Sequence, residues 1–130
     1  MSGYPRTKIA SGGPYEDVVG YSRVVVAGPL AFVAGTTASS DGSPIPETCE
    51  EQTRQTIEIM RKKLAVAGFS LSEVVRVRMF VVDIKRDWPV VSKAMNEYFA
   101  EIRPVMTMVQ VAGLIDDAML IEIEMDAVRQ

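Results

Sequence analysis

The sequence reads PVMTMVQVAG over residues 104–113 and LIEIEMDAV over residues 120–128, and these two stretches decide the fold. Successive side chains of a β-strand point to opposite faces of the sheet, so each stretch predicts a strand with two distinct rows of side chains. Only a short acidic connection separates them. If they pair as neighbours, Met106 and Glu122 lie on the same surface of the sheet, and we place the candidate site on this surface.

Turn residues and periodicity divide the rest of the chain into four further strands and two helices. Strands are expected over residues 7–10, 21–27, 30–37 and 74–82. The first helix is expected over residues 48–68, where Thr48 and Glu51 have the spacing of a capping box and Ile57, Met60, Leu64 and Ala67 form one apolar stripe. The second is expected from Asp87, as N-cap with Pro89 in its first turn, to Arg103.

This order of elements predicts an α+β fold, in which two helices pack on one face of a mixed β-sheet of about six strands. The other face would then be uncovered. It is expected to carry the apolar side chains of Phe80, Val82, Met106, Met108 and Leu120. Because exposed apolar patches of this kind usually mark an interface, we expect a homo-oligomer whose subunits cover each other's sheets.

Length and charge limit the classes of protein that fit. A chain of 130 residues suits a single domain over residues 1–130. Its 14 basic and 17 acidic residues give a net charge of −3, which argues against a nucleic-acid partner, since such binding needs clustered Lys and Arg. No long apolar run follows the N-terminus, so we expect neither a signal peptide nor a membrane span, and a cytoplasmic location.

The sequence contains no histidine and one cysteine, Cys49. Serine–histidine and cysteine–histidine catalysis are thereby excluded, as is a ribonuclease mechanism with paired imidazoles. The common zinc sites lack their ligands, and we expect no metal and no cofactor. Acidic neighbours are expected to raise the pKa of Cys49, which we interpret as a structural residue.

Short motifs follow one another from residue 20 to the C-terminus in a characteristic order. They are GYS (20–22), FVAG (32–35), QTRQT (52–56), AG (67–68), VV (74–75) with Phe80 and Asp83, VQVA (109–112) and IEIE (121–124). Together they resemble the RidA (YjgF) family, whose members are often labelled endoribonuclease L-PSP. The resemblance implies a chorismate-mutase-like fold of the bacillus type, a homotrimer, and small-molecule sites in the clefts between subunits.

The resemblance also implies a chemistry and its residues. Family enzymes hydrolyse reactive enamines and imines, such as 2-aminoacrylate, to a keto acid and ammonia. By position, Glu122 would orient or activate the attacking water, and Tyr21 and Gly35 would line the pocket. The arginine with which the family holds the substrate carboxylate is replaced by Met106, and a thioether cannot supply the two parallel charged hydrogen bonds of a guanidinium. We therefore expect an altered substrate range.

Another cation could compensate for the lost arginine. Our hypothesis is that Arg78 or Arg103 supplies the positive charge, and Arg23, close to Tyr21, is a further candidate. By strand alternation Arg78 shares a face with Phe80. Glu124 and Asp126 are interpreted as ion-pair partners of Arg76, of Arg78 or of a neighbouring subunit.

Plainer explanations stay open for each of these residues. Glu122 could be a solvated or ion-paired carboxylate, Tyr21 a core aromatic, Gly35 a site of close backbone packing and Met106 a gap-filling core residue. Two other functions also stay open. One is a non-catalytic ligand-binding or regulatory trimer, and the weaker one is an endoribonuclease.

Overall fold

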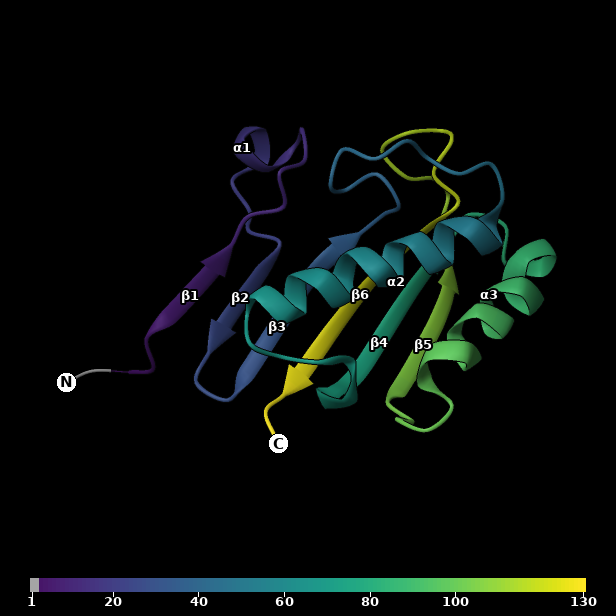
Figure 1. Ribbon diagram of the computed structural model, residues 1–130. Coiled ribbons are helices and arrows are strands. Elements are labelled where there is room, and N and C mark those ends of the chain that lie inside the picture. Colours follow the sequence, from purple (N-terminus) through teal and green to yellow (C-terminus); the bar gives the residue numbers. More distant parts are fainter. Residues whose placement is uncertain (1–2) are drawn as a thin grey trace.

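Six strands form one mixed sheet in the computed structural model, which describes residues 3–130, so the first two residues of the expected domain lie outside it (Figure 1). The spatial order is β1-β2-β3-β6-β4-β5. Neighbouring strands are antiparallel except for β4 and β5, which are parallel. Their bounds are Arg6–Ile9 (β1), Val24–Ala27 (β2), Leu30–Thr36 (β3), Val74–Val81 (β4), Val105–Gln110 (β5) and Ile121–Val128 (β6). The predicted mixed sheet is confirmed.

Two long helices, α2 (Cys49–Val66) and α3 (Ile84–Phe99), lie across the same face of this sheet (Figure 1). The predicted apolar stripe of α2 is confirmed, since Ile57, Met60 and Leu64 are fully buried. Its predicted N-cap is also correct, because the amide of Glu51 donates to Thr48 Oγ1 at 3.2 Å. The remaining helical pieces are the short α1 (Glu16–Val19) and a 3-10 turn over Leu71–Glu73.

The predicted start of the second helix is wrong. Helix α3 begins at Ile84, and its N-cap is Asp83, whose side chain accepts a hydrogen bond from the Arg86 amide at 3.2 Å. Asp87 instead lies within the first turn, buried, and accepts two hydrogen bonds from the Arg86 side chain at 2.9 and 2.7 Å. Both aspartates satisfy the local cap preference, and only the end of β4 at Val81 decides between them.

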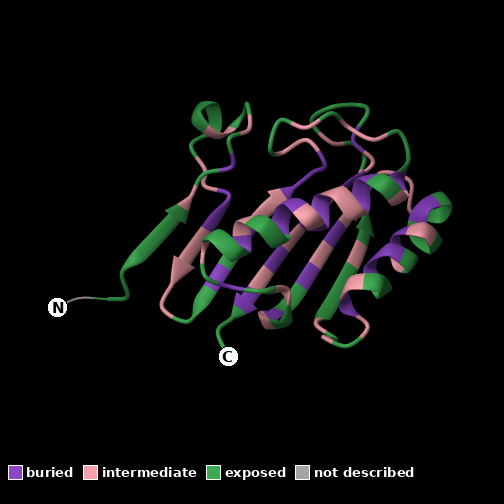
Figure 2. Ribbon diagram, in the orientation of Figure 1, coloured by how far each residue is buried: buried purple, intermediate pink, exposed green. Residues whose placement is uncertain are grey.

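The core lies between the sheet and the two helices. On β6 the residues Ile121, Ile123 and Met125 are fully buried, whereas the acidic residues that alternate with them are half-buried on the opposite face. Figure 2 shows this alternation as bands along the central strands. The predicted two-sided character of residues 120–128 is therefore confirmed, and we call the surface that carries the acidic residues of β6 the open face.

The predicted pairing of the two C-terminal strands is wrong, because β4 lies between β5 and β6. Met106 is aligned with the buried Val77 and so points to the helix side of the sheet, while Glu122 is aligned with Phe80 on the open face. Helix α3 connects β4 to β5 as a crossover, which makes these two strands parallel neighbours and leaves the other edge of β4 free for β6. Met106 and Glu122 consequently lie on opposite surfaces of the sheet.

The open face carries a different set of apolar residues from the predicted one. Phe80 lies there as expected, but Met106 and Met108 are on the helix side and Leu120 packs against the core. The prediction also fails for Val82, which follows the end of β4 and is half-buried. The exposed apolar side chains of the open face include Leu30 and Phe32 of β3, Val105 and Val109 of β5, and Val128 of β6.

Within residues 3–130, none of the helices combines the length and the apolar character that crossing a membrane requires. The same residues contain no group of three or more Cys, Asp or Glu side chains placed to hold a metal ion.

Candidate functional site

Gly35 and Glu122 meet where the pairing of β3 with β6 is irregular. The register shifts between Val33 and Thr36, so Gly35 lies in a β-bulge. A Cβ atom added to Gly35 would lie 3.0 Å from Cδ and 3.1 Å from Oε2 of Glu122. The absence of a side chain at Gly35 therefore leaves room for the carboxylate, which gives this glycine a specific role at the site.

A cavity of about 370 Å³ opens beside this carboxylate. It is lined by Tyr21 from the segment before β2, by Gly35 from the bulge and by Glu122 from β6, together with Arg23. The loops that follow β3 and β5 lie beside one another at this end of the sheet, with α1 close by (Figure 1), and Ser40 and Ile115 of these loops complete the wall. Three of the predicted site residues are thus brought together.

Arg23 is the residue that the sequence reasoning undervalued. Its side chain is 2% exposed, and its Nη1 donates to the Gly35 carbonyl oxygen at 2.6 Å and to Thr36 Oγ1 at 3.1 Å. Its Nη2 donates to the Tyr21 hydroxyl at 3.3 Å, and the guanidinium carbon lies 5.3 Å from the centre of the Tyr21 ring. The sequence did contain a signal for this role, because Arg23 stands between Tyr21 and the apolar residues of β2.

The surroundings of Glu122 shift the pKa of its carboxyl group. Burial raises its pKa above the ordinary value, the positive charge of Arg23 opposes this rise, and the negative charge of Glu124 adds to it. Among residues 3–130 we find no donor that hydrogen-bonds its carboxylate. A raised pKa and free lone pairs beside a cavity suit a group that accepts a proton or orients a water.

Replacing Glu122 by Gln is expected to raise the free energy of unfolding at neutral pH. Because the pKa of Glu122 is higher in the folded than in the unfolded chain, stability falls as the pH rises through the interval between the two values. A neutral Gln side chain avoids the cost of ionising a buried carboxyl group. The gain in the free energy of unfolding should therefore shrink as the pH drops towards the ordinary pKa of a glutamate, where Glu122 is neutral as well. Urea unfolding across this interval, with the exposed Glu101→Gln as control, measures the difference; a gain that does not depend on pH would contradict the assignment.

The two predicted compensating arginines lie on different sides of the sheet. On the open face Arg78 is already paired, with its Nη1 3.2 Å from Glu124 Oε1 and 3.4 Å from Asp126 Oδ2. The interpretation of these two acidic residues as ion-pair partners is confirmed. Arg103 lies on the helix side, at a second cavity of about 550 Å³ between α3 and β5 that Met106 also lines.

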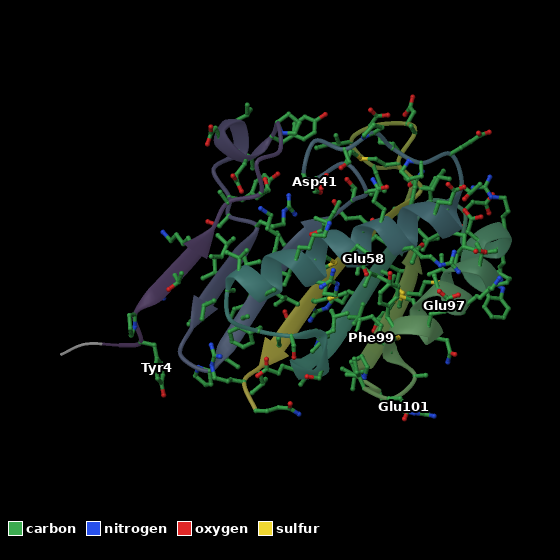
Figure 3. All side chains as sticks on the ribbon, in the orientation of Figure 1. Tyr4, Asp41, Glu58, Glu97, Phe99 and Glu101 are labelled. Atoms are coloured by element: carbon green, nitrogen blue, oxygen red, sulfur yellow. The ribbon has the colours of Figure 1, made fainter. Side chains whose placement is uncertain are left out.

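The structure therefore divides five of the six predicted site residues into two groups, and Arg78 lines neither cavity. Tyr21, Gly35 and Glu122 form one group around the first cavity, and Met106 and Arg103 form the other group around the second. A single chain does not bring the two groups together. Figure 3 shows the side chains of the helix layer in front of the sheet, with Phe99 at the α3 end where the second cavity lies.

Cys49 is buried and its thiol has a pKa raised to about 12, first by burial and then by the negative charge of Asp87. The predicted direction is correct, but the acidic partner comes from α3 and not from the neighbouring sequence. Since a thiol with this pKa stays protonated at neutral pH, Cys49 is not poised to act as a nucleophile.

Comparison with known proteins places this chain in a family. The family model described as Endoribonuclease L-PSP matches residues 14–129. The crystal structure of Rv2704 from Mycobacterium tuberculosis, described as a member of the YjgF/YER057c/UK114 family, is 44% identical with a TM-score of 0.87, and the match covers 95% of this chain and 99% of that one. Protein mmf2, mitochondrial, from Schizosaccharomyces pombe is 41% identical over 98 residues, which cover 75% of this chain and 69% of mmf2.

A third relative is TdcF from Escherichia coli K12, whose name describes it as a candidate reactive intermediate deaminase. It is 28% identical over 113 residues, covering 84% of this chain and 86% of TdcF. The crystal structure of E. coli TdcF with bound serine has a TM-score of 0.79 at 25% identity and covers 100% of both chains. The match of the sheet and its two helices to such structures confirms the chorismate-mutase-like fold, and the chain belongs to the RidA/YjgF family.

Proposed function

We propose that this protein is a RidA-like hydrolase that converts a small enamine or imine and water into a carbonyl compound and ammonia. The observation that carries the proposal is the half-buried carboxylate of Glu122, which faces a cavity beside Tyr21 and Gly35 and accepts no hydrogen bond from residues 3–130. The name of the relative TdcF supports the same class of reaction.

Glu122 would act on water in this reaction. The water oxygen adds to the imine carbon while the carboxylate takes one of its protons and passes it to the nitrogen, which gives a neutral carbinolamine. The carboxylate then takes the proton of the carbinolamine hydroxyl and gives it to the nitrogen, so that the carbon–nitrogen bond breaks, the carbonyl group forms and ammonia leaves. A carboxylate with a raised pKa suits both transfers, because it is a stronger base than an ordinary glutamate and therefore accepts a proton more readily.

A neighbouring subunit would complete the site. We infer a homotrimer in which the cavity between α3 and β5 of one subunit faces the Glu122 cavity of the next. The substrate would then meet Met106, Met108 and Phe99 as an apolar wall, with Arg103 as the cation at its edge. Such a wall favours substrates that are larger and less acidic than 2-aminoacrylate.

The arginine part of this proposal has its own test. Since Arg78 is already paired with Glu124 and Asp126, Arg103→Ala should weaken the binding of a keto acid and Arg78→Ala should not. Calorimetric titration of both variants decides between them. If both leave binding unchanged, neither arginine supplies the charge.

The catalytic proposal is tested with imines made in place by an amino acid oxidase, by measuring ammonia release above the spontaneous rate. Glu122→Gln is expected to lower kcat/KM by roughly 10²-fold, because it removes the group that accepts the proton from water. Glu101→Gln, an exposed carboxylate on the helix side of the molecule, is the matched control and should be as active as the parent. Full activity of Glu122→Gln would contradict the proposal.

A non-catalytic ligand-binding trimer is the alternative, favoured by the pairing of both arginines that β4 places on the open face, Arg78 with Glu124 and Asp126 and Arg76 with Asp126 at 3.9 Å. Binding of metabolites without turnover in the same assays would support it. Cleavage of RNA by purified protein, lost in Glu122→Gln, would instead support the endoribonuclease activity that the family description names.

A further inference from the structure

Arg23 is among the largest fully buried side chains of the protein, at 2% exposure. Charged residues are almost never buried to this extent unless they are paired, because an uncompensated charge is costly to remove from water. Yet no carboxylate within residues 3–130 forms a salt bridge with Arg23, and its Nε atom is buried without a hydrogen-bond partner there. An apolar side chain would fill this buried position without the cost of removing a charge from water. Packing therefore does not explain why the residue is an arginine.

The contacts of Arg23 converge on the walls of the Glu122 cavity. One nitrogen, Nη1, holds both the Gly35 carbonyl and the Thr36 hydroxyl, and that hydroxyl in turn donates to the Ala34 carbonyl at 2.7 Å. The other terminal nitrogen holds the Tyr21 hydroxyl. One guanidinium therefore ties the irregular part of β3 to the segment before β2. It fixes Gly35 at the place where its missing side chain admits the Glu122 carboxylate.

We propose that Arg23 is the positioning residue of the Glu122 site, which rests on the function proposed above. Its buried guanidinium holds the Gly35 carbonyl and the Tyr21 hydroxyl in place, and its positive charge favours the ionised form of the neighbouring Glu122 carboxylate, which can act on water.

The charges around Glu122 support the electrostatic half of this role. Glu124, on the same strand, disfavours ionisation of Glu122, and Arg23 favours it. Arg78 on β4 is engaged by Glu124 and Asp126, and the other titratable side chains at the cavity are the tyrosines Tyr15 and Tyr21. Among the described residues, Arg23 is thus the cation that acts on Glu122 and is not neutralised by an ion pair.

The other part of the proposed role, which is to hold Gly35 and Tyr21 in place, depends on the shape of the guanidinium. A planar fork with several fixed donors can hold three acceptors at once, whereas an ammonium at the end of a flexible stem is a compact point charge. Arg23→Lys therefore keeps the charge and loses the fork. Arg23→Met removes both but retains most of the side-chain volume.

Three variants separate these contributions: Arg23→Met, Arg23→Lys and, as control, Arg61→Met on the exposed surface of α2. The main readout is the NMR titration of the Glu122 carboxyl carbon, assigned by comparison with Glu122→Gln. We expect Arg23→Met to move this titration, and the acidic limb of the kcat/KM profile, to higher pH. Arg23→Lys should leave the titration close to that of the parent and lower kcat by about 10²-fold, since small misplacements of a catalytic group have effects of this size. The control should change neither.

An unchanged Glu122 titration in folded Arg23→Met would overturn the electrostatic role, and an unchanged kcat in Arg23→Lys would overturn the geometric role. If Arg23→Met does not fold, Arg23→Gln, which can still donate to the Gly35 carbonyl, takes its place in the titration. The titration needs no substrate. If Glu122→Gln proves fully active, the proposed hydrolase function fails, while the titration still decides whether Arg23 controls the ionisation of Glu122.

Discussion

Ile123→Ala is expected to lower the free energy of unfolding by about 2–5 kcal/mol, the usual range for truncating a fully buried isoleucine. Ile123 is 0% exposed, and its strand β6 lies inside the sheet, aligned with Thr36 on β3 and with Met79 on β4. Because hydrogen-bonded strands hold β6 on both sides, the surrounding structure has little freedom to collapse into the space that the truncated side chain leaves. The lost contacts are therefore not recovered.

Equilibrium unfolding in urea measures this loss. Ile115→Ala is the matched control, since Ile115 is 69% exposed in the loop between β5 and β6 and the substitution is chemically the same. The control should change the free energy of unfolding by less than about 0.5 kcal/mol. Equal effects of the two substitutions would contradict the placement of Ile123 in the core.

Gly35→Val is expected to lower kcat/KM by about 10²-fold, because the new side chain would occupy the space of the Glu122 carboxylate and displace it. A Cβ atom alone would already lie 3.0 Å from Glu122 Cδ. Gly35 does not have a positive φ, so the backbone itself accommodates valine and the effect is expected at the site, not in the conformation of the chain.

The kinetic constants of Gly35→Val are compared with those of Gly113→Val, since a Cβ atom at Gly113 meets nothing within 4 Å. The NMR signal of the Glu122 carboxyl group should shift in the first variant and stay unchanged in the second. If Gly35→Val kept both the parent signal and the parent rate, Glu122 would have to act from a different position.

Local patterns in the sequence predicted most of the secondary structure. The alternation of β6 and the apolar stripe of α2 depend only on which residues recur at a fixed spacing, and the N-cap at Thr48 depends on neighbours three residues apart. The start of α3 was mispredicted because two aspartates offer the same local cap, and the end of the preceding strand selects Asp83.

The site was predictable only in part. The family resemblance pointed to Tyr21, Gly35 and Glu122, and these residues do line one cavity. The central place of Arg23 was not foreseen, because burial and a convergence of contacts from two separate segments are properties of the folded chain. Since arginine is usually exposed, the sequence alone favours a solvent-exposed position for Arg23.

What the sequence by itself determined is which side chains share a face within each strand and helix, since covalent geometry sets those periods. What only the tertiary structure decided is which strands are neighbours. The insertion of β6 between β3 and β4 placed Glu122 beside Arg23 and left Met106 on the other surface. Which strands pair depends on the crossover through α3 and on burying the apolar faces of all the strands and helices in one core. The spacing of residues along one strand encodes neither.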